Sequence, residues 1–179
     1  IFFYVIKGKA SVKIDNDKKE ITQGQFVYVP VGKKYEFEKF KKDTQILTFH
    51  KVYEKLEGYA IPKTIFGDAA KVKGPEYLGD PALHLQVLLP ENFSFDMAVN
   101  IFTYESGGHL PMVETHIMEH GLIYLQGQGV YMLDQQWYPI KKGDSIWMAP
   151  YCQQWFTAMG KEPAVYIYYK NVNRFPTTV

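Results

Sequence analysis

The chain has 179 residues, of which 46% are hydrophobic and 22% charged, a composition typical of a soluble globular protein with one large core or two small ones. The net charge of +1 gives no reason to expect nucleic acid or an anionic membrane as a partner, and no apolar run approaches the ~20 residues that span a bilayer. The single cysteine, Cys152, excludes an intrachain disulfide and favours a reducing compartment.

The first third of the chain contains a unit that recurs 119 residues later. Gly8 recurs as Gly127 and Gly24 as Gly143, and the runs GQFVYVP and GDSIWMAP are the same element used twice. We therefore interpret residues 1–56 as the C-terminal part of a first copy whose earlier strands are missing from the sequence. A targeting signal cannot be assessed for this reason, and a cytoplasmic location is expected if the protein is bacterial.

Residues 57–90 contain eight glycines and prolines, a density of breakers that predicts a winding connection. Within it, the run LHLQVLL at 83–89 predicts a strand that enters the following unit. Residues 91–179 then alternate apolar and polar positions in short runs such as FDMAVNIFTYESG, LIYLQGQGVYML and AVYIYYK, separated by turn residues. Many short strands of this kind predict an all-β sandwich or barrel.

Four polar residues in this last part have side chains suited to a metal ion. Glu114 and His116 are two apart and would share one face of a strand, His120 follows after three residues, and Gln154 lies eleven residues after Gly143. Carboxylate and amide oxygens are hard donors and imidazole is borderline, so the set favours Mn²⁺ or Fe²⁺ in six-coordinate geometry. With one anionic ligand, such a site would suit a substrate carboxylate.

The spacing of these residues resembles the two-part signature of the cupin superfamily. The first part reads Gly108, five residues, Glu114-x-His116, three residues, His120, six residues and Gly127. The intervals match the family in every case, although Glu stands where the family has its first His and His stands where it has Glu. The resemblance implies a tandem double cupin, two jelly-roll β-barrels, with an incomplete first cupin at 1–56, a connecting segment at 57–90 and a second, metal-binding cupin at 91–179.

The first copy lacks the usual ligand types. Tyr35 occupies its second-motif slot and Ile1 aligns with His120, so two of the four positions cannot serve as the usual ligands. We therefore expect the first cupin to bind no metal and the second to be the active one.

The match then narrows to one family. The segments ETHIMEH, WMAPYCQQWF and KNVNRFP resemble the (S)-ureidoglycine aminohydrolases, manganese bicupins of purine-ureide breakdown. The resemblance covers the whole chain and implies Mn²⁺ as the cofactor. It also implies substrate contacts from Glu114, Gln154, Tyr166 and Lys170, with Glu114 and Lys170 as the catalytic residues. The ligands implied are Glu114, His116, His120 and Gln154.

The reaction that the resemblance implies is hydrolysis of a linear, amidine-like C–N bond: (S)-ureidoglycine gives (S)-ureidoglycolate and ammonia in allantoin catabolism. The expected partner is a small ureide, and aromatic strand surfaces favour a homo-oligomer. Two alternatives remain open, a metal-dependent cupin oxygenase and a non-catalytic cupin that binds a small molecule. Consumption of O₂ would identify the first, and ligand binding by metal-free protein would favour the second.

Overall fold

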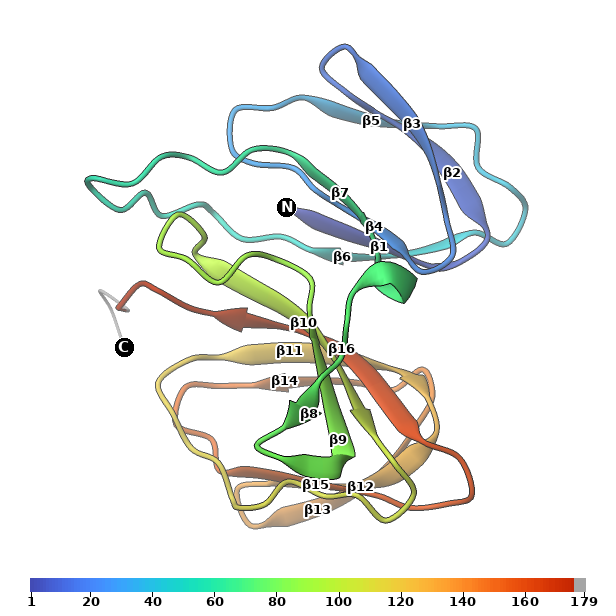
Figure 1. Ribbon diagram of the computed structural model, residues 1–179, viewed down its shortest axis with the longest axis vertical. Helices are drawn as coiled ribbons and strands as arrows, with labels where there is room; N and C mark the ends of the chain where they lie inside the picture. Colours follow the sequence, from blue (N-terminus) through green and yellow to red (C-terminus); the bar gives the residue numbers. More distant parts are fainter. Residues whose placement is uncertain (176–179) are drawn as a thin grey trace. The chain divides into compact units, whose positions relative to one another are not determined.

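The computed structural model describes residues 1–175, whose regular elements are almost all β-strands, as the alternating sequence predicts (Figure 1). Residues 176–179, the end of the expected second cupin, lie outside this range. The described chain forms two compact units, one of Ile1–Val72 with Asn92–Asp96 and one of Lys73–Glu91 with the residues from Met97 onward. One 3₁₀ turn, η1 (Ala69–Lys71), interrupts the strands, and no helix in residues 1–175 is long and apolar enough to cross a membrane.

The first unit contains two antiparallel sheets. One sheet has the order β6-β1-β4-β7 and the other β3-β2-β5. Apolar residues on alternate positions of both sheets, such as Val5, Val12 and Val27, meet in a shared core. The strands are β1 (Phe2–Lys7), β2 (Lys9–Ile14), β3 (Asp17–Thr22), β4 (Gln25–Tyr28), β5 (Tyr35–Glu38), β6 (Gln45–Phe49) and β7 (Ile65–Asp68).

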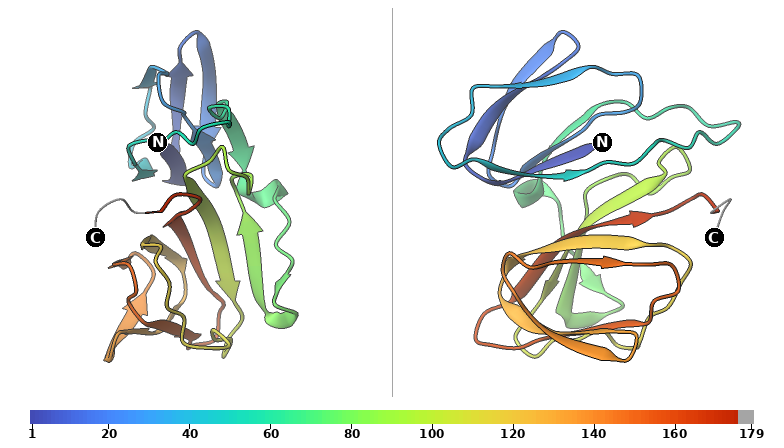
Figure 2. Two further views of the ribbon diagram at one scale, coloured as in Figure 1. Left: turned by 90° about the vertical axis from the view of Figure 1, so that its left-hand side faces the viewer. Right: turned by 180° about the vertical axis from the view of Figure 1, so that it is seen from behind.

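The second unit also contains two sheets that enclose a core (Figure 2). A six-stranded sheet has the order β14-β11-β16-β10-β9-β8, and a three-stranded sheet has the order β13-β12-β15. The core is rich in buried aromatic rings from both sheets, among them Phe102, Tyr124, Tyr131 and Phe156. The strands are β8 (Glu76–Tyr77), β9 (Asp80–Val87), β10 (Met97–Tyr104), β11 (His120–Gln126), β12 (Gln128–Leu133), β13 (Gln136–Lys141), β14 (Ser145–Met148), β15 (Gln154–Ala158) and β16 (Ala164–Asn171).

The repeat predicted from the sequence is present in the arrangement of the strands. β2 begins at Lys9 and β12 at Gln128, 119 residues later, and the same interval separates the start of β3 from that of β13. The pairings recur as well, because β1 pairs with β4 and β6, and β11 pairs with β14 and β16. The two units therefore use the same succession of strands for their common part.

The stretch 57–90, expected as a winding connection, is divided between the two units instead. β7 pairs with β4 in the first unit, whereas β9, the strand predicted at 83–89, pairs with β10 in the second. Gly67 was counted among the residues that interrupt strands, but it lies within β7 for a steric reason. A Cβ at this position would lie 2.1 Å from the ring of Phe26. Gly67 therefore makes room for a buried aromatic ring within a strand and does not interrupt it.

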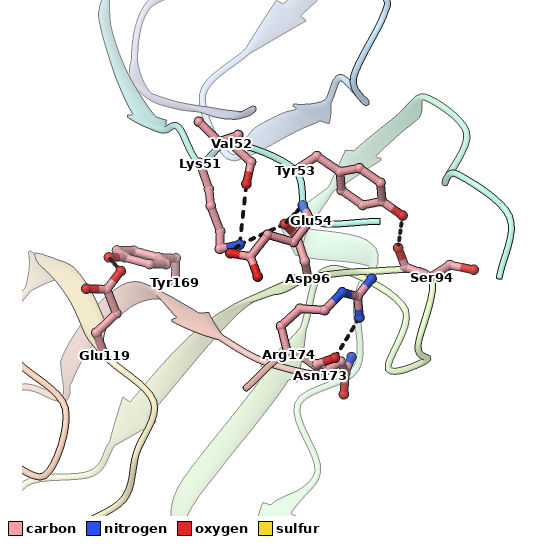
Figure 3. Close-up of polar contacts among 10 residues, drawn as sticks. All are labelled: Lys51, Val52, Tyr53, Glu54, Ser94, Asp96, Glu119, Tyr169, Asn173 and Arg174. Atoms are coloured by element: carbon pink, nitrogen blue, oxygen red, sulfur yellow. Dashed lines mark hydrogen bonds and ion pairs between the residues drawn. The ribbon is translucent and has the colours of Figure 1, made fainter. Parts of the chain in front are cut away.

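A buried ion pair fixes the short segment Asn92–Asp96 within the first unit (Figure 3). The Asp96 side chain is only 2% exposed, and its Oδ2 lies 2.9 Å from Lys51 Nζ and accepts a hydrogen bond from the Glu54 backbone N–H. Lys51 also pairs with Glu54 at 2.8 Å. Burial lowers the pKa of Lys51, but the hydrogen bonds to the two carboxylates outweigh burial, so the pKa is raised and the ammonium is retained.

Candidate functional site

The second unit contains a cavity of about 110 Å³ between its two sheets. All six residues predicted to form the site line this cavity, although they come from four different parts of the chain. The predicted residues in the lining are Glu114, His116, His120, Gln154, Tyr166 and Lys170.

Glu114 and His116 do not lie in a regular strand, contrary to the expectation that strand alternation would place them on one face. They belong to an irregular segment before β11, which is hydrogen-bonded to the segment 151–154. Glu114 and Gln154 form an isolated bridge, with N–H to O distances of 2.8 and 2.9 Å, and the His116 carbonyl accepts from the Tyr151 N–H at 2.7 Å. Backbone pairing between distant segments, rather than alternation along one strand, therefore places both side chains at the cavity.

The two imidazoles and the Gln154 amide converge at the cavity wall. Gln154 Nε2 lies 3.2 Å from His116 Nε2 and 3.4 Å from His120 Nδ1, and the two imidazole ring centroids are 4.6 Å apart. The Gln154 side chain is oriented by the fully buried Tyr131, which also lines the cavity and whose hydroxyl donates to Gln154 Oε1 at 2.9 Å. Tyr131 was not singled out from the sequence, because its contact with Gln154 joins residues 23 positions apart.

Burial and one nearby charge set the protonation of these groups. Burial lowers the pKa of His120 to about 3, with further contributions from the charges of Lys170 and His116. Burial and Lys170 also lower the pKa of His116. Both imidazoles are therefore neutral near pH 7, and each offers a nitrogen lone pair. Burial raises the pKa of Glu114, and the Lys170 charge opposes that effect.

The types of donor at the cavity fit a divalent metal ion. His116 Nδ1 and His120 Nε2 are buried and have no hydrogen-bond partner within residues 1–175, and such unpaired buried nitrogens indicate that a partner of these two rings is missing. One carboxylate, two neutral imidazoles and one amide are the donors that Mn²⁺ or Fe²⁺ accepts. Within residues 1–175, however, no three His, Cys, Asp or Glu side chains are clustered closely enough to hold a metal by themselves. The four side chains therefore share the lining of one cavity without standing at metal-ligand distances from a single point.

Strand β16 contributes a row of polar groups to the cavity. Tyr166, Tyr168 and Lys170 are two residues apart in turn, so they share one face of the strand, and all three line the cavity. Tyr168 was missed, although the alternation that pairs Tyr166 with Lys170 includes it. Burial lowers the pKa of Lys170, and Glu114 opposes this effect. The row therefore combines two hydroxyls and one amine, groups that bind oxygen atoms and exchange protons.

A second contact holds the segment around His120 in place. The Tyr169 hydroxyl donates to Glu119 Oε1 at 2.8 Å (Figure 3), and Tyr169 pairs across the sheet with Gly121. A Cβ at Gly121 would lie 2.4 Å from Tyr169 Cε1. The glycine therefore allows the ring to lie directly over the backbone next to His120.

We expect Gly121→Ala to lower the free energy of unfolding by about 1–3 kcal/mol, because the added methyl group overlaps the Tyr169 ring. Denaturant unfolding of the variant measures this change. Gly121→Ala combined with Tyr169→Ala should be less destabilised than the sum of the two single variants, because removal of the ring makes room for the methyl group. An additive pair would show that the overlap is not the cause.

Comparisons with known proteins agree with the geometry. A model of the cupin domain family matches residues 100–169. The chain is 37% identical over 175 residues to (S)-ureidoglycine aminohydrolase of Escherichia coli strain K12, covering 97% of this chain and 67% of that protein. It is 33% identical to the Arabidopsis thaliana (S)-ureidoglycine aminohydrolase, covering 97% of this chain and 57% of that protein. The crystal structure of protein Ylba from E. coli superposes with a TM-score of 0.82 at 31% identity, over 99% of this chain and 69% of that one.

Proposed function

Because the chain belongs to the (S)-ureidoglycine aminohydrolase family of the cupins, we propose that the protein hydrolyses (S)-ureidoglycine to (S)-ureidoglycolate and ammonia in purine catabolism. The observation that carries the proposal is the convergence of all six family-type residues on one cavity. The chain spans about two thirds of the E. coli protein and 57% of the Arabidopsis one, so the proposal concerns the whole protein of which these residues are part.

We further propose that the whole protein is a tandem double cupin. The strand arrangement of the first unit recurs in the second at an interval of 119 residues, which supports two copies of one barrel. The first unit has Tyr35 and Ile1 at positions that correspond to Gln154 and His120, and neither of those side chains is a usual metal ligand. We assign the chemistry to the second unit for this reason.

The proposed metal is Mn²⁺, with Glu114, His116, His120 and Gln154 as its ligands. When bound, such an ion supplies a fixed positive charge that binds and polarises substrate oxygen. Coordination through Gln154 Oε1 requires the amide to turn over, so that Nε2 faces Tyr131. The Tyr131 hydroxyl allows this because a hydroxyl can accept as well as donate, and both amide orientations are therefore satisfied.

The proposed mechanism uses the protein groups of the cavity for binding and proton transfer. The carbon that carries the amine also carries the ureido nitrogen, whose lone pair expels ammonia and leaves an imine. Water then adds to the imine carbon. Together, Glu114 and Lys170 carry out both proton transfers. They give one proton to the leaving amine, which departs as ammonia, and they take one proton from the attacking water. The two side chains therefore return to their starting state. Tyr166 and Tyr168 hold substrate oxygens and so fix which face of the imine the water attacks.

The test is ammonia release from freshly generated (S)-ureidoglycine by the full-length protein, above the spontaneous decay of the substrate. We expect a large excess with added Mn²⁺, a loss of that excess after treatment with a chelator, and the S enantiomer of the product. Parallel measurements of O₂ consumption cover the oxygenase alternative. No excess ammonia from protein that demonstrably contains metal would refute the proposed function.

A further inference from the structure

Strand β10 lies directly beside β16 and carries two buried polar side chains against the cavity-lining row. Phe102 of β10 pairs with Tyr166, and Asn100 pairs with Tyr168. Tyr104, two residues beyond Phe102, reaches back to Tyr166, and the two hydroxyl oxygens are 2.9 Å apart. Tyr104 is 0% exposed and does not line the cavity, whereas Tyr166 does.

The direction of the hydrogen bond between these hydroxyls follows from counting protons. Burial raises the pKa of both tyrosines well above the usual value, so each keeps its proton. Within residues 1–175 the Tyr104 hydroxyl makes no hydrogen bond other than that to Tyr166. If Tyr166 donated, the Tyr104 proton would be buried without an acceptor, which is unfavourable. If Tyr104 donates, the Tyr166 proton is free to point into the cavity, where a ligand or water accepts it.

The neighbouring tyrosine of the row has the same kind of support. Asn100, 5% exposed, donates from Nδ2 to the Tyr168 hydroxyl at 3.0 Å. The oxygen of Tyr168 is thus occupied as an acceptor, and its proton is also available to the cavity. Two consecutive cavity-facing tyrosines of β16 therefore each accept a hydrogen bond from a buried polar side chain of β10.

We propose that Tyr104 is a positioning residue that donates to Tyr166 and thereby makes the Tyr166 hydroxyl a hydrogen-bond donor to an oxygen of the bound substrate, a carboxylate or ureido carbonyl oxygen. The identity of the substrate rests on the proposed function, whereas the direction of the hydrogen bond does not. A donor hydroxyl at this point discriminates by polarity: an oxygen acceptor is stabilised there, while an ammonium or amide N–H group meets another proton. The hydrogen bond from Tyr104 also polarises the Tyr166 O–H and strengthens it as a donor.

The first part of the test needs no substrate and compares unfolding midpoints of three variants of the full-length protein. Tyr166→Phe removes the one partner that the buried Tyr104 hydroxyl has among residues 1–175, so it should lower the midpoint more than Tyr104→Phe, which leaves Tyr166 in contact with the cavity. Tyr124→Phe is the matched control. Tyr124 is 1% exposed, its ring centroid is 5.3 Å from that of Tyr166, and its hydroxyl has no partner within residues 1–175, so its removal should leave the midpoint unchanged or raise it.

The second part measures turnover of (S)-ureidoglycine and calorimetric binding of hydantoate, a stable ureido acid that lacks the labile amine. Tyr104→Phe should raise KM and the hydantoate Kd by about two- to tenfold, the value of one neutral hydrogen bond, with a smaller effect on kcat. In the Tyr166→Phe background the same substitution should have no further effect, because Tyr104 acts through Tyr166. Tyr124→Phe should leave KM and kcat unchanged.

The outcomes separate this inference from the proposed function. If the wild-type protein neither releases ammonia from (S)-ureidoglycine nor binds hydantoate, the proposed function fails, and the unfolding midpoints still test whether the Tyr104 hydroxyl depends on Tyr166 as its partner. The inference is overturned if Tyr104→Phe is as harmless to stability as Tyr124→Phe. It is also overturned if the effects of Tyr104→Phe and Tyr166→Phe on KM are additive, because additivity is the result of independent packing effects.

Discussion

Replacing Lys170 with methionine is expected to reduce turnover of (S)-ureidoglycine by about 10²–10⁴-fold, the range typical for loss of a general acid or base. Methionine keeps most of the length and apolar volume of lysine, so the half-buried position on β16 stays filled. Lys170 occupies no proposed ligand position, and Mn²⁺ binding should therefore be retained. Ammonia release and metal content, measured on the same preparation, test both statements.

Lys161 provides the matched control for this substitution. It is an exposed lysine in the turn before β16, is not among the residues that line the cavity, and makes the same change of charge when replaced with methionine. Lys161→Met should retain wild-type turnover. Retained turnover in Lys170→Met would show that Lys170 moves no proton in the reaction, and loss of bound metal there would point to a role in the metal site instead.

The second large effect is expected for His120→Phe, which should weaken Mn²⁺ binding. Replacing a residue that only hydrogen-bonds to a metal ligand costs about 10–100-fold in affinity, and removing a ligand itself should cost more. Phenylalanine keeps a ring at this position, where the centroid of the His120 ring lies 4.6 Å from that of His116 and 5.6 Å from that of Tyr168. It removes a buried nitrogen that has no partner within residues 1–175 and also the 3.4 Å contact between His120 Nδ1 and Gln154 Nε2. These two effects oppose each other, so the metal-free variant should be close to the metal-free wild type in stability.

Titration of chelator-treated protein with Mn²⁺, followed by electron paramagnetic resonance, measures the affinity. His109→Phe serves as control, because His109 is exposed and is not among the residues that line the cavity. Its Mn²⁺ affinity should equal that of the wild type. Wild-type affinity in His120→Phe would exclude His120 from the proposed ligand set.

The sequence alone was sufficient for the features that depend on regular spacing. Alternating apolar residues predicted the all-β architecture, and the interval of 119 residues predicted a repeat that extends to strand pairing. The spacing of Glu114, His116, His120 and Gln154 predicted residues that share one cavity, although it did not show the irregular backbone that places the first two there.

Two kinds of feature could not be predicted from the sequence. One is a strand without visible alternation: β13 was not recognised because four of its six residues, Gln136 to Pro139, are exposed in succession. The other kind is a residue that hydrogen-bonds to a site residue far away in the sequence. Tyr131 contacts Gln154, and Tyr104 contacts Tyr166 across 62 positions of sequence, so no local pattern marks either residue.

The division of Glu57–Pro90 between the two units was missed because glycine has two opposite uses. A sequence rich in glycine and proline indicates turns, yet Gly67 lies within β7 and makes room for the Phe26 ring. Spacing cannot distinguish a glycine that ends a strand from one over which a neighbouring ring packs.

The interval of 119 residues also relates two lysines, Lys51 and Lys170, whose surroundings differ. Both are partly buried, and burial lowers the pKa of each. Lys51 pairs with two carboxylates, those of Asp96 and Glu54, which outweigh burial and raise its pKa. At Lys170 the charge of Glu114 opposes burial but does not outweigh it, so the pKa is lowered. At corresponding positions of the repeat, one lysine is thus an ion-paired cation that secures the chain, whereas the other lies at the cavity with a lowered pKa. The number of acidic neighbours, rather than the lysine itself, therefore sets the direction in which each pKa is shifted.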